Sequence, residues 1–371
     1  MNHMLSGLRF QCGIVFLLLS ALVPVAQADM RELLVDPDDG MLDASAMLNT
    51  AWGFMPVVMP ITEPAVGLGL AGAGVWFHEK LTTTASGKVY LPSVSGLMAM
   101  ATENGSRGLG GFHQQSWDDD NWSYTGMLFD GKVYLGAYNE RLDKQLDYDL
   151  DGSFTLHRLA RRLSSGLKAS LAYQWARSEV GFDDIPDAFN DTNAALEFGL
   201  EYDRLDNPLS PMKGLKANLT LKDFNENWGG DSDFRMVKFD GRWHQPMGEW
   251  RLATRLLLEQ ATQQTPFYSL PFVSLRGVPA MAYFGNQVTS LEAEVGYQFS
   301  RRWSGIVFAG YGESNSSLRS IPFQFDANIS AGGFGFRYLI AKTYGLHAGV
   351  DVAHNSDSGS ALYIQMGSAW H

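Results

Sequence analysis

The stretch LDYDLDGSFTLH, residues 146–157, alternates apolar and polar side chains with a period of two. One face carries Leu146, Tyr148, Leu150, Gly152, Phe154 and Leu156, and the other carries Asp147, Asp149, Asp151, Ser153, Thr155 and His157. This period is typical of a β-strand whose two faces meet different environments. In a soluble sandwich the apolar face would line the core, whereas in a membrane barrel it faces lipid and the acids face a wet lumen.

The same alternation recurs along the rest of the chain and decides between these two folds. It is found in the segments 167–175, 196–203, 215–222, 291–299, 333–340 and 361–371. After residue 28 no stretch has 18 consecutive apolar residues, which excludes a helical membrane protein. So many two-faced strands predict an all-β fold, a transmembrane antiparallel β-barrel, with the soluble β-sandwich as the alternative.

Residues 1–28 have the pattern of a signal peptide. Arg9 provides the positive charge, residues 14–25 form a short apolar core, and Ala26–Ala28 form a small-residue cleavage site. A membrane anchor is the alternative, but the apolar run is too short to span a bilayer comfortably. The single cysteine, Cys12, lies in this segment, so the exported chain has no disulfide. The sequence therefore predicts export, and with the barrel pattern it predicts the outer membrane of a Gram-negative bacterium.

The charge of the chain argues against a nucleic-acid partner. The full sequence has a formal charge of -12, and loss of Arg9 with the signal peptide changes this to -13. Binding to phosphate backbones needs an excess of lysine and arginine.

About sixteen strands can be assigned, and their connections differ in length. The expected strands are 66–79, 91–103, 107–117, 121–129, 132–140, 146–163, 167–182, 191–206, 212–225, 233–247, 250–263, 288–300, 302–313, 329–340, 345–355 and 361–370. The count uses a turn at Asp130-Gly131, because single-chain bacterial barrels have even strand numbers. The long connections 80–90, 183–190, 264–287 and 314–328 are expected on the outer side, and the short ones in the periplasm.

The connection 264–287 contains the segment SLRGVPAMAYFG, residues 274–285, in which Arg276 is surrounded by apolar and aromatic side chains. Such a loop exposed to water would be unfavourable, so we expect it to fold into the lumen. Buried there, the guanidinium of Arg276 needs a carboxylate partner. Strand alternation turns Glu294 inward, because its neighbours Ala293 and Val295 face lipid.

These residues also resemble a known family. The segment 274–299 is similar to the most diagnostic part of the BamA/TamA outer-membrane proteins, also called the bacterial surface antigen family. The segments 60–70, 101–108, 201–214, 332–355 and 361–370 resemble other parts of that family, so the resemblance covers nearly the whole exported chain.

The resemblance implies a sixteen-stranded barrel whose sixth outer loop is latched inside the lumen. Carried over to this sequence, the latch consists of Leu275, Arg276 and Gly277, with Glu294 as the acidic partner. A second acid that the family has one strand later is replaced by Gly310. One acidic partner is therefore expected instead of two.

Larger members of the family carry POTRA domains, but the 37 residues from Asp29 to the first expected strand are too few for one. We expect 1–28 to be the signal peptide, 29–65 a periplasmic tail with a segment leading into the barrel, and 66–371 the outer-membrane barrel. The family inserts client strands where its first and last strands meet. The expected seam residues are Gly67, Gly69, Gly72 and Gly74 on the first strand, and Gly367 and Trp370 on the last. Alternatively, these first-strand glycines face inward and make room for the loop.

The resemblance implies a protein that is not an enzyme and that acts in protein insertion or translocation, or in lipid handling. The implied partners are the lipid bilayer with lipopolysaccharide, client outer-membrane or secreted proteins, and a periplasmic protein that replaces the POTRA domains. One alternative is a cation-preferring pore lined by Asp147, Asp149, Asp151, Glu197 and Glu201. A lipid hydrolase is a third possibility, although no serine–histidine pair can be placed.

The sequence predicts neither a cofactor nor a metal site. No histidines have a metal-ligand spacing such as His-x-x-x-His, and there is no phosphate-binding loop or nucleophile elbow. The acidic turn Asp118–Asp120, expected on the outer side, is either a solvated turn or a divalent-cation contact with lipopolysaccharide.

Overall fold

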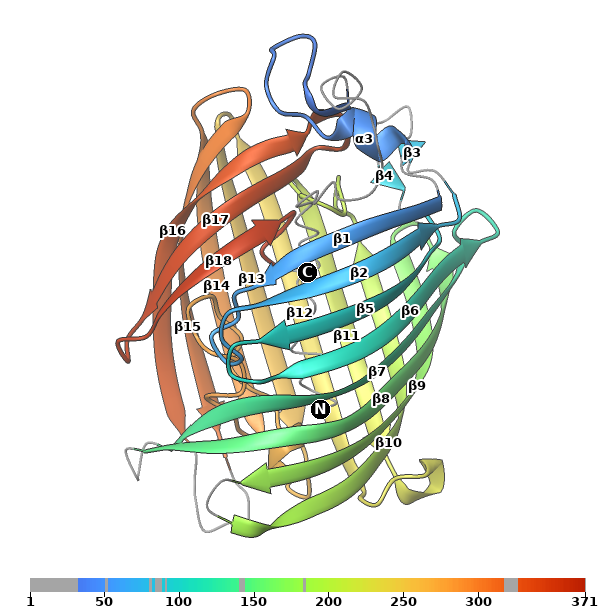
Figure 1. Cartoon of the computed structure of the whole chain (residues 1–371), viewed down its shortest axis with the longest axis vertical. Coiled ribbons are helices and arrows are strands. Elements are labelled where there is room, and N and C mark those ends of the chain that lie inside the picture. The colour runs from blue at the N-terminus through green and yellow to red at the C-terminus, as the bar shows by residue number, and fades with distance from the viewer. Residues whose placement is uncertain are drawn as a thin grey trace.

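The structure, a computed structural model, describes residues 33–50, 53–79, 82–83, 89–90, 92–139, 144–182, 185–316 and 326–370. The predicted signal peptide lies outside these residues. Sixteen strands form one antiparallel sheet that curls into a barrel (Figure 1). Within the described ranges no helix is long and apolar enough to cross a membrane. The predicted fold class is confirmed.

The elements follow in chain order. They are α3 (Ser45–Thr50), β1 (Gly53–Ile61), β2 (Gly69–Phe77), β3 (Thr82–Thr83), β4 (Val89–Tyr90), β5 (Val94–Thr102), β6 (Arg107–Trp117), β7 (Trp122–Asn139), β8 (Lys144–Ser164), β9 (Leu167–Phe182), β10 (Ile185–Asp203), β11 (Gly214–Phe224), η1 (Glu226–Trp228), β12 (Phe234–Met247), β13 (Trp250–Ala261), η2 (Phe267–Ser269), β14 (Gln287–Gln298), β15 (Trp303–Asn315), β16 (Ala327–Ala341), η3 (Lys342–Tyr344), β17 (Leu346–Asn355) and β18 (Ser360–Met366). Strands β3 and β4 form a separate two-stranded sheet.

The first strand differs from the expected one. β1 pairs with β2 from Gly53↔Phe77 to Ile61↔Gly69, so the barrel begins at residue 53, and the expected strand 66–79 is the second. The expected turn at Asp130-Gly131 is also wrong, because both residues pair with β8 inside the continuous strand β7. One missed strand and one false turn cancel, which is why the count of sixteen is still right.

Because of these two differences, the connections before β7 lie at the opposite end of the barrel from the one expected. The end of the barrel that carries α3, uppermost in Figure 1, is called here the terminal end, and the opposite end is the loop end. Because antiparallel strands alternate in direction, the β2–β5 connection and the turn Asp118–Asp120 lie at the terminal end. Both had been expected at the other end. From β8 onward the expected and observed sides agree.

The outer wall of the barrel is apolar. Large exposed side chains on it include Leu171, Phe198, Leu200, Leu219, Leu291, Phe334, Phe336 and Leu362. Five of the six large exposed tryptophans in the described ranges lie near the terminal end, at Trp76, Trp117, Trp243, Trp250 and Trp303, and the sixth, Trp228, lies at the loop end. An apolar band bordered by aromatic rings is the surface that a membrane barrel presents to lipid.

Strand β8, which contains residues 146–157, has its faces reversed relative to the expectation. Tyr148 and Leu150 point into the lumen and pack in one cluster with Phe272 and Met281 of the β13–β14 connection, whereas Asp147 and Asp151 are exposed. The lumen is dry here because the loop fills it with apolar side chains. β8 is 21 residues long, about twice the length needed to cross a bilayer, so its acidic face can project into water.

Candidate functional site

The β13–β14 connection, residues 262–286, folds back into the lumen as expected. Two backbone hydrogen bonds join its two arms. The amide of Val273 donates to the carbonyl of Tyr283 at 2.8 Å, and the amide of Gly285 donates to the carbonyl of Pro271 at 3.0 Å. Leu275, Arg276 and their neighbours are buried. The loop packs against the inner wall formed by β14 and β16.

Arg276 is the most heavily bonded side chain of this loop. Its Nε donates to Glu292 Oε1 at 2.8 Å, and its Nη1 donates to Glu294 Oε2 at 2.8 Å and to Asp351 Oδ2 at 3.0 Å. Its backbone amide also donates to Glu292, at 3.0 Å. The guanidinium lies 3.7 Å from the centre of the Phe308 ring. The structure thus brings Arg276 together with Glu294 and adds two acids that were not predicted.

The two additional acids differ in how far the sequence could have indicated them. Glu292 lies two residues before Glu294, so the same alternation turns it inward. Asp351 is on β17, three strands along the sheet from β14, which carries Glu292 and Glu294. Only the register of the sheet brings Asp351 to Arg276. At Gly310, where the resembled family has its second acid, a Cβ would lie 2.8 Å from Leu275 Cδ2 and 3.3 Å from Glu292 Cγ. That position leaves room for the loop.

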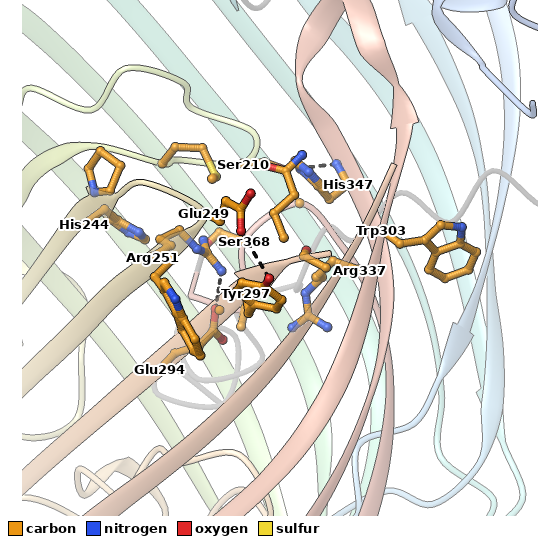
Figure 2. A pocket seen from close by; sticks show the side chains of 18 of the residues that line it. Ser210, His244, Glu249, Arg251, Glu294, Tyr297, Trp303, Arg337, His347 and Ser368 are labelled. Atoms are coloured by element: carbon orange, nitrogen blue, oxygen red, sulfur yellow. Dashed lines mark hydrogen bonds and ion pairs between the residues drawn. The ribbon is translucent and has the colours of Figure 1, made fainter. Parts of the chain in front are cut away.

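The buried charges around Arg276 balance. Arg251 binds Glu294, and Arg337 binds Asp351 with 2.8 Å between Nη2 and Oδ2. Figure 2 shows Arg251 reaching toward Glu294 from the neighbouring strand. Three arginines and three carboxylates therefore share one network. Balance matters because an unpaired buried charge is far more costly than a paired one.

Gly277 lets the loop approach the last two strands. It has a φ of +93°, and a Cβ there would lie 3.0 Å from Ala353 Cβ. Its amide donates to the Tyr363 hydroxyl at 2.9 Å, and its carbonyl accepts from Asn355 Nδ2 at 2.7 Å. The loop is therefore tied to β17 and β18 as well as to β14.

Replacement of Gly277 by alanine should destabilise the folded loop. The left-handed backbone conformation costs an L-residue roughly 1–2 kcal/mol, and the new methyl group would press on Ala353. Gly229→Ala is the matched control, because Gly229 has a φ of +96° and no atom within 4 Å of its Cβ position. Limited proteolysis of residues 262–286 should be faster in Gly277→Ala than in Gly229→Ala. Equal rates would show that close approach to Ala353 is unimportant.

The sheet has two edges, β1 and β18, which face each other (Figure 1). Within the described strands every other neighbouring pair has a hydrogen-bonded ladder, but this pair has none. The loop touches both sides of this seam. Besides binding Tyr363 on β18, it donates from the amide of Ala280 to Glu63 Oε1 at 3.0 Å, and Glu63 follows β1.

The predicted seam residues on the N-terminal side are not at the seam. Gly69, Gly72 and Gly74 are on β2, and Gly67 precedes that strand. Gly72 and Gly74 also share their face with exposed Leu70 and Trp76. They therefore point outward and do not make room for the loop.

The predicted seam residues on the C-terminal side follow β18. Gly367, with a φ of +79°, turns the chain inward after Met366. Trp370, expected at the seam on the last strand, is instead buried in the lumen. Its Nε1 donates to Glu292 Oε1 at 2.6 Å. The C-terminal residues thus contact the acid that holds Arg276.

Residues 33–50 form a compact segment, called here the clasp, at the terminal end. Arg302, in the β14–β15 turn, binds Asp39 at 2.7 Å, Asp43 at 2.6 Å and also Asp36. Lys342, in η3, adds contacts to Asp36 and Asp38. The apolar side of the clasp packs on the barrel through a cluster that contains Ala44, Leu48, Tyr344, Leu346 and Met366. These residues had been expected as a periplasmic tail.

Acid should release the clasp. Hydrogen bonding to Arg302 lowers the pKa of Asp39. Burial acts to raise the pKa of Asp43, but hydrogen bonds from Ser45 and Arg302 outweigh it and the net pKa is lowered. Lowered values stabilise docking above the ordinary aspartate pKa of about 4, and this stabilisation is lost as the pH falls through them. A spin label at Met41→Cys should be immobile at pH 7 and become mobile when the pH is lowered to 2. Unchanged mobility at pH 2 would refute this.

Other acidic residues that the sequence analysis singled out form ion pairs or lie outside the lumen. Asp120 binds Lys168 at 3.1 Å and also Arg162, and its turn is at the terminal end, opposite the end that carries the β13–β14 connection. Glu197 points inward but is bound by Arg158 at 2.7 Å. Asp147 and Asp151 lie outside the lumen, so they cannot line the alternative cation pore. In the described part of the chain, no group of three or more His, Cys, Asp or Glu is placed to hold a metal ion.

Comparison with known proteins identifies the architecture. The Omp85 superfamily domain matches residues 96–359. BamA from Haemophilus ducreyi lacking POTRA domains 1-3 is a similar solved structure, with a TM-score of 0.59, 12% identity, and coverage of 92% of this chain and 82% of that one. Two CdiB structures each match 84% of this chain at 11% identity. CdiB from Acinetobacter baumannii has a TM-score of 0.54 with 59% of its own chain covered, and CdiB from Escherichia coli has a TM-score of 0.59 with 61% covered. No curated protein sequence matches.

Proposed function

The chain belongs to the Omp85 superfamily of outer-membrane β-barrels, and from that premise we propose that it inserts or translocates proteins at the seam between β1 and β18. The terminal end would face the periplasm and the loop end the outside. The proposed clients are outer-membrane or secreted proteins, and a periplasmic protein is the proposed partner. The proposal assigns no enzymatic step to the chain.

The observation that carries the proposal is the unpaired seam. A sheet edge presents free N–H and C=O groups that can pair with an incoming strand. β1 contains Pro56 and Pro60, which have no N–H and which sheets tolerate on edge strands. They are four positions apart, an even number, so both missing donors fall on one edge of β1. Because β1 keeps its ladder with β2, that edge is the one toward β18. The prolines, rather than the predicted glycines, would keep the seam weak.

A disulfide across the seam should abolish activity. The exported chain has no native cysteine, so pairs can be scanned between residues 53–61 and 360–366 without interference. The assay measures assembly of a mixed outer-membrane protein fraction into proteoliposomes that contain the oxidised variant, and reduction should restore it. The control is a disulfide at the ladder pair Leu219↔Phe239, which locks strands that are already paired. Full activity with the seam locked would refute a seam mechanism.

The loop contacts support the same proposal. The loop binds Glu63 beside β1 and Tyr363 on β18, so it bridges the two edges from inside. Opening of the seam would have to break or stretch one of these contacts. The latch at Arg276 would then hold the loop in place while one edge moves.

A further inference from the structure

The two edges of the seam differ in the hydrogen-bonding groups that they leave free. In an antiparallel sheet the N–H and C=O groups of one residue point to the same side of its strand, and successive residues alternate between the two sides. One hydrogen bond to a neighbouring strand therefore fixes which residues point to the other side. Bonds of this kind are present beside both edges.

On β1 the even-numbered residues point to the free edge. The amide of His78, which follows β2, donates to the carbonyl of Ser93 at 2.9 Å. Even-numbered residues of β2 therefore point toward β5, and the odd-numbered ones point toward β1. In the β1–β2 register odd-numbered residues lie opposite odd-numbered ones, as in Val57↔Ala73. The odd-numbered residues of β1 thus bond to β2, and the even-numbered ones point away from it.

This free edge of β1 is poor in donors. Its residues are Phe54, Pro56, Val58 and Pro60. All four have a C=O group, but proline has no N–H, so only Phe54 and Val58 can donate. A strand that paired with this edge would miss every second donor from β1. Prolines on an edge strand are one means by which native proteins prevent pairing there.

The free edge of β18 is complete. The amide of Gly367 donates to the carbonyl of His347 at 2.7 Å, and the amide of Asn355 donates to the carbonyl of Gly359 at 2.9 Å. Odd-numbered residues on the β18 side of this ladder therefore bond to β17. The even-numbered ones point to the seam, where no strand of the described chain pairs with them, and each has both an N–H and a C=O group. They are Ser360, Leu362, Ile364 and Met366.

The surroundings of this edge favour the addition of a strand. Leu362 and Ile364 are exposed on the outer wall, so the edge lies in the apolar band. Hydrocarbon offers no water to bind unpaired N–H and C=O groups, and leaving them unpaired there is costly. The inner side of β18 is held in place, because the Tyr363 hydroxyl binds the loop and Gln365 Oε1 accepts from Arg337 at 2.9 Å. β18 is thus a fixed strand with a complete and unused edge.

We propose that β18, and not β1, accepts the incoming client strand, and that this strand is the first strand of a barrel client. The inference rests on the proposed function and names the partner of the seam. β18 runs from the loop end to the terminal end, so an antiparallel partner runs from the periplasm outward. An even number of strands puts both chain ends of a barrel on the side from which it arrives, so its first strand runs outward. The apolar side chains of that strand would lie beside Leu362 and Ile364.

The test places a photoreactive benzoylphenylalanine at one of three matched positions. Phe54 on β1 and Leu362 on β18 flank the seam and are 57% and 49% exposed, and Leu219, in the middle of the sheet, is 48% exposed. Proteoliposomes that contain the exported chain receive a urea-unfolded eight-stranded outer-membrane barrel, and mass spectrometry identifies the cross-linked segment. Position 362 should cross-link to the first strand of this client before position 54 gives any product. Position 219 should give only background.

Proline substitutions test the hydrogen bonds themselves. Ile364→Pro removes one N–H from the free edge of β18 and none from its ladder with β17. The client concentration that gives half-maximal cross-linking at position 362 should rise about tenfold, the effect of losing about one hydrogen bond. Val58→Pro removes an N–H from the free edge of β1 in the same way and should not change that concentration. Equal effects of the two substitutions would overturn the choice of edge.

The other outcomes separate this inference from the proposed function. Cross-linking of the client at position 54 alone, or of its last strand at position 362, would overturn the inference and leave a function at the seam. Assembly of the client without a cross-link at either edge would overturn both. A cross-link at position 362 to a second copy of this chain would show a dimer contact in place of a client site. Cross-linking at position 362 needs no proline substitution, so the test stays decisive if Ile364→Pro fails to fold.

Discussion

Arg276→Ala is expected to lower the free energy of unfolding of the barrel by about 3–5 kcal/mol, the range seen when one partner of a buried charge group is removed. The side chain is 4% exposed and contacts Glu292, Glu294 and Asp351. Without it, three carboxylates face only the two remaining arginines of the network. The contact with the Phe308 ring is lost as well.

Unfolding by guanidinium in detergent, followed by tryptophan fluorescence, measures the effect, and proteolysis of the loop reports its release. Arg235→Ala is the control, because Arg235 is exposed and has one acidic partner, Asp223. It should cost less than about 1 kcal/mol. Glu292→Gln, alone and combined with Arg276→Ala, completes a double-mutant cycle. A coupling energy near zero between Arg276 and Glu292, with the loop still protected, would refute the latch.

The barrel itself could be predicted because the lipid face of each strand depends mainly on local sequence. Alternation correctly placed Phe198 and Leu200 outside, and Glu294 inside. The same rule was wrong for β8, where the inner wall meets an apolar loop from far along the chain. Period two identifies a strand with two faces, but what lies against each face depends on tertiary contacts.

The same distinction between local sequence and tertiary contacts applies to the residues of the candidate site. Glu294 could be predicted because it lies on the strand that follows the loop. Asp351 could not, because the register of several strands brings it to Arg276. The start of the barrel was missed because Pro56 and Pro60 make β1 read as a linker. Prolines are tolerated there only because one edge of β1 needs no donors.

The clasp raises a question that the sequence did not: what holds the N-terminal segment against the barrel. Both edges of the seam are connected to it, since the chain continues from the clasp into β1 and since Met366 of β18 packs in the same cluster as Ala44 and Leu48. Arg302 is the centre of the polar contact. It is 3% exposed and binds Asp36, Asp39 and Asp43 together.

Arg302→Ala should therefore undock the clasp. Three carboxylates would be left close together with Lys342 as the nearest cation, and the loss of about 3 kcal/mol or more of docking free energy would reduce the ratio of docked to free clasp at least about a hundredfold. A spin label at Met41→Cys should become mobile at pH 7. Arg301→Ala is the matched control, because the adjacent Arg301 forms no ion pair within the described residues.

Hydrogen exchange should also be faster in β18, since Met366 loses its packing against Leu48. A mobile label with unchanged hydrogen exchange in β18 would show that docking of the clasp does not stabilise the seam. An immobile label would show that the apolar contacts of Ala44 and Leu48 suffice to hold it.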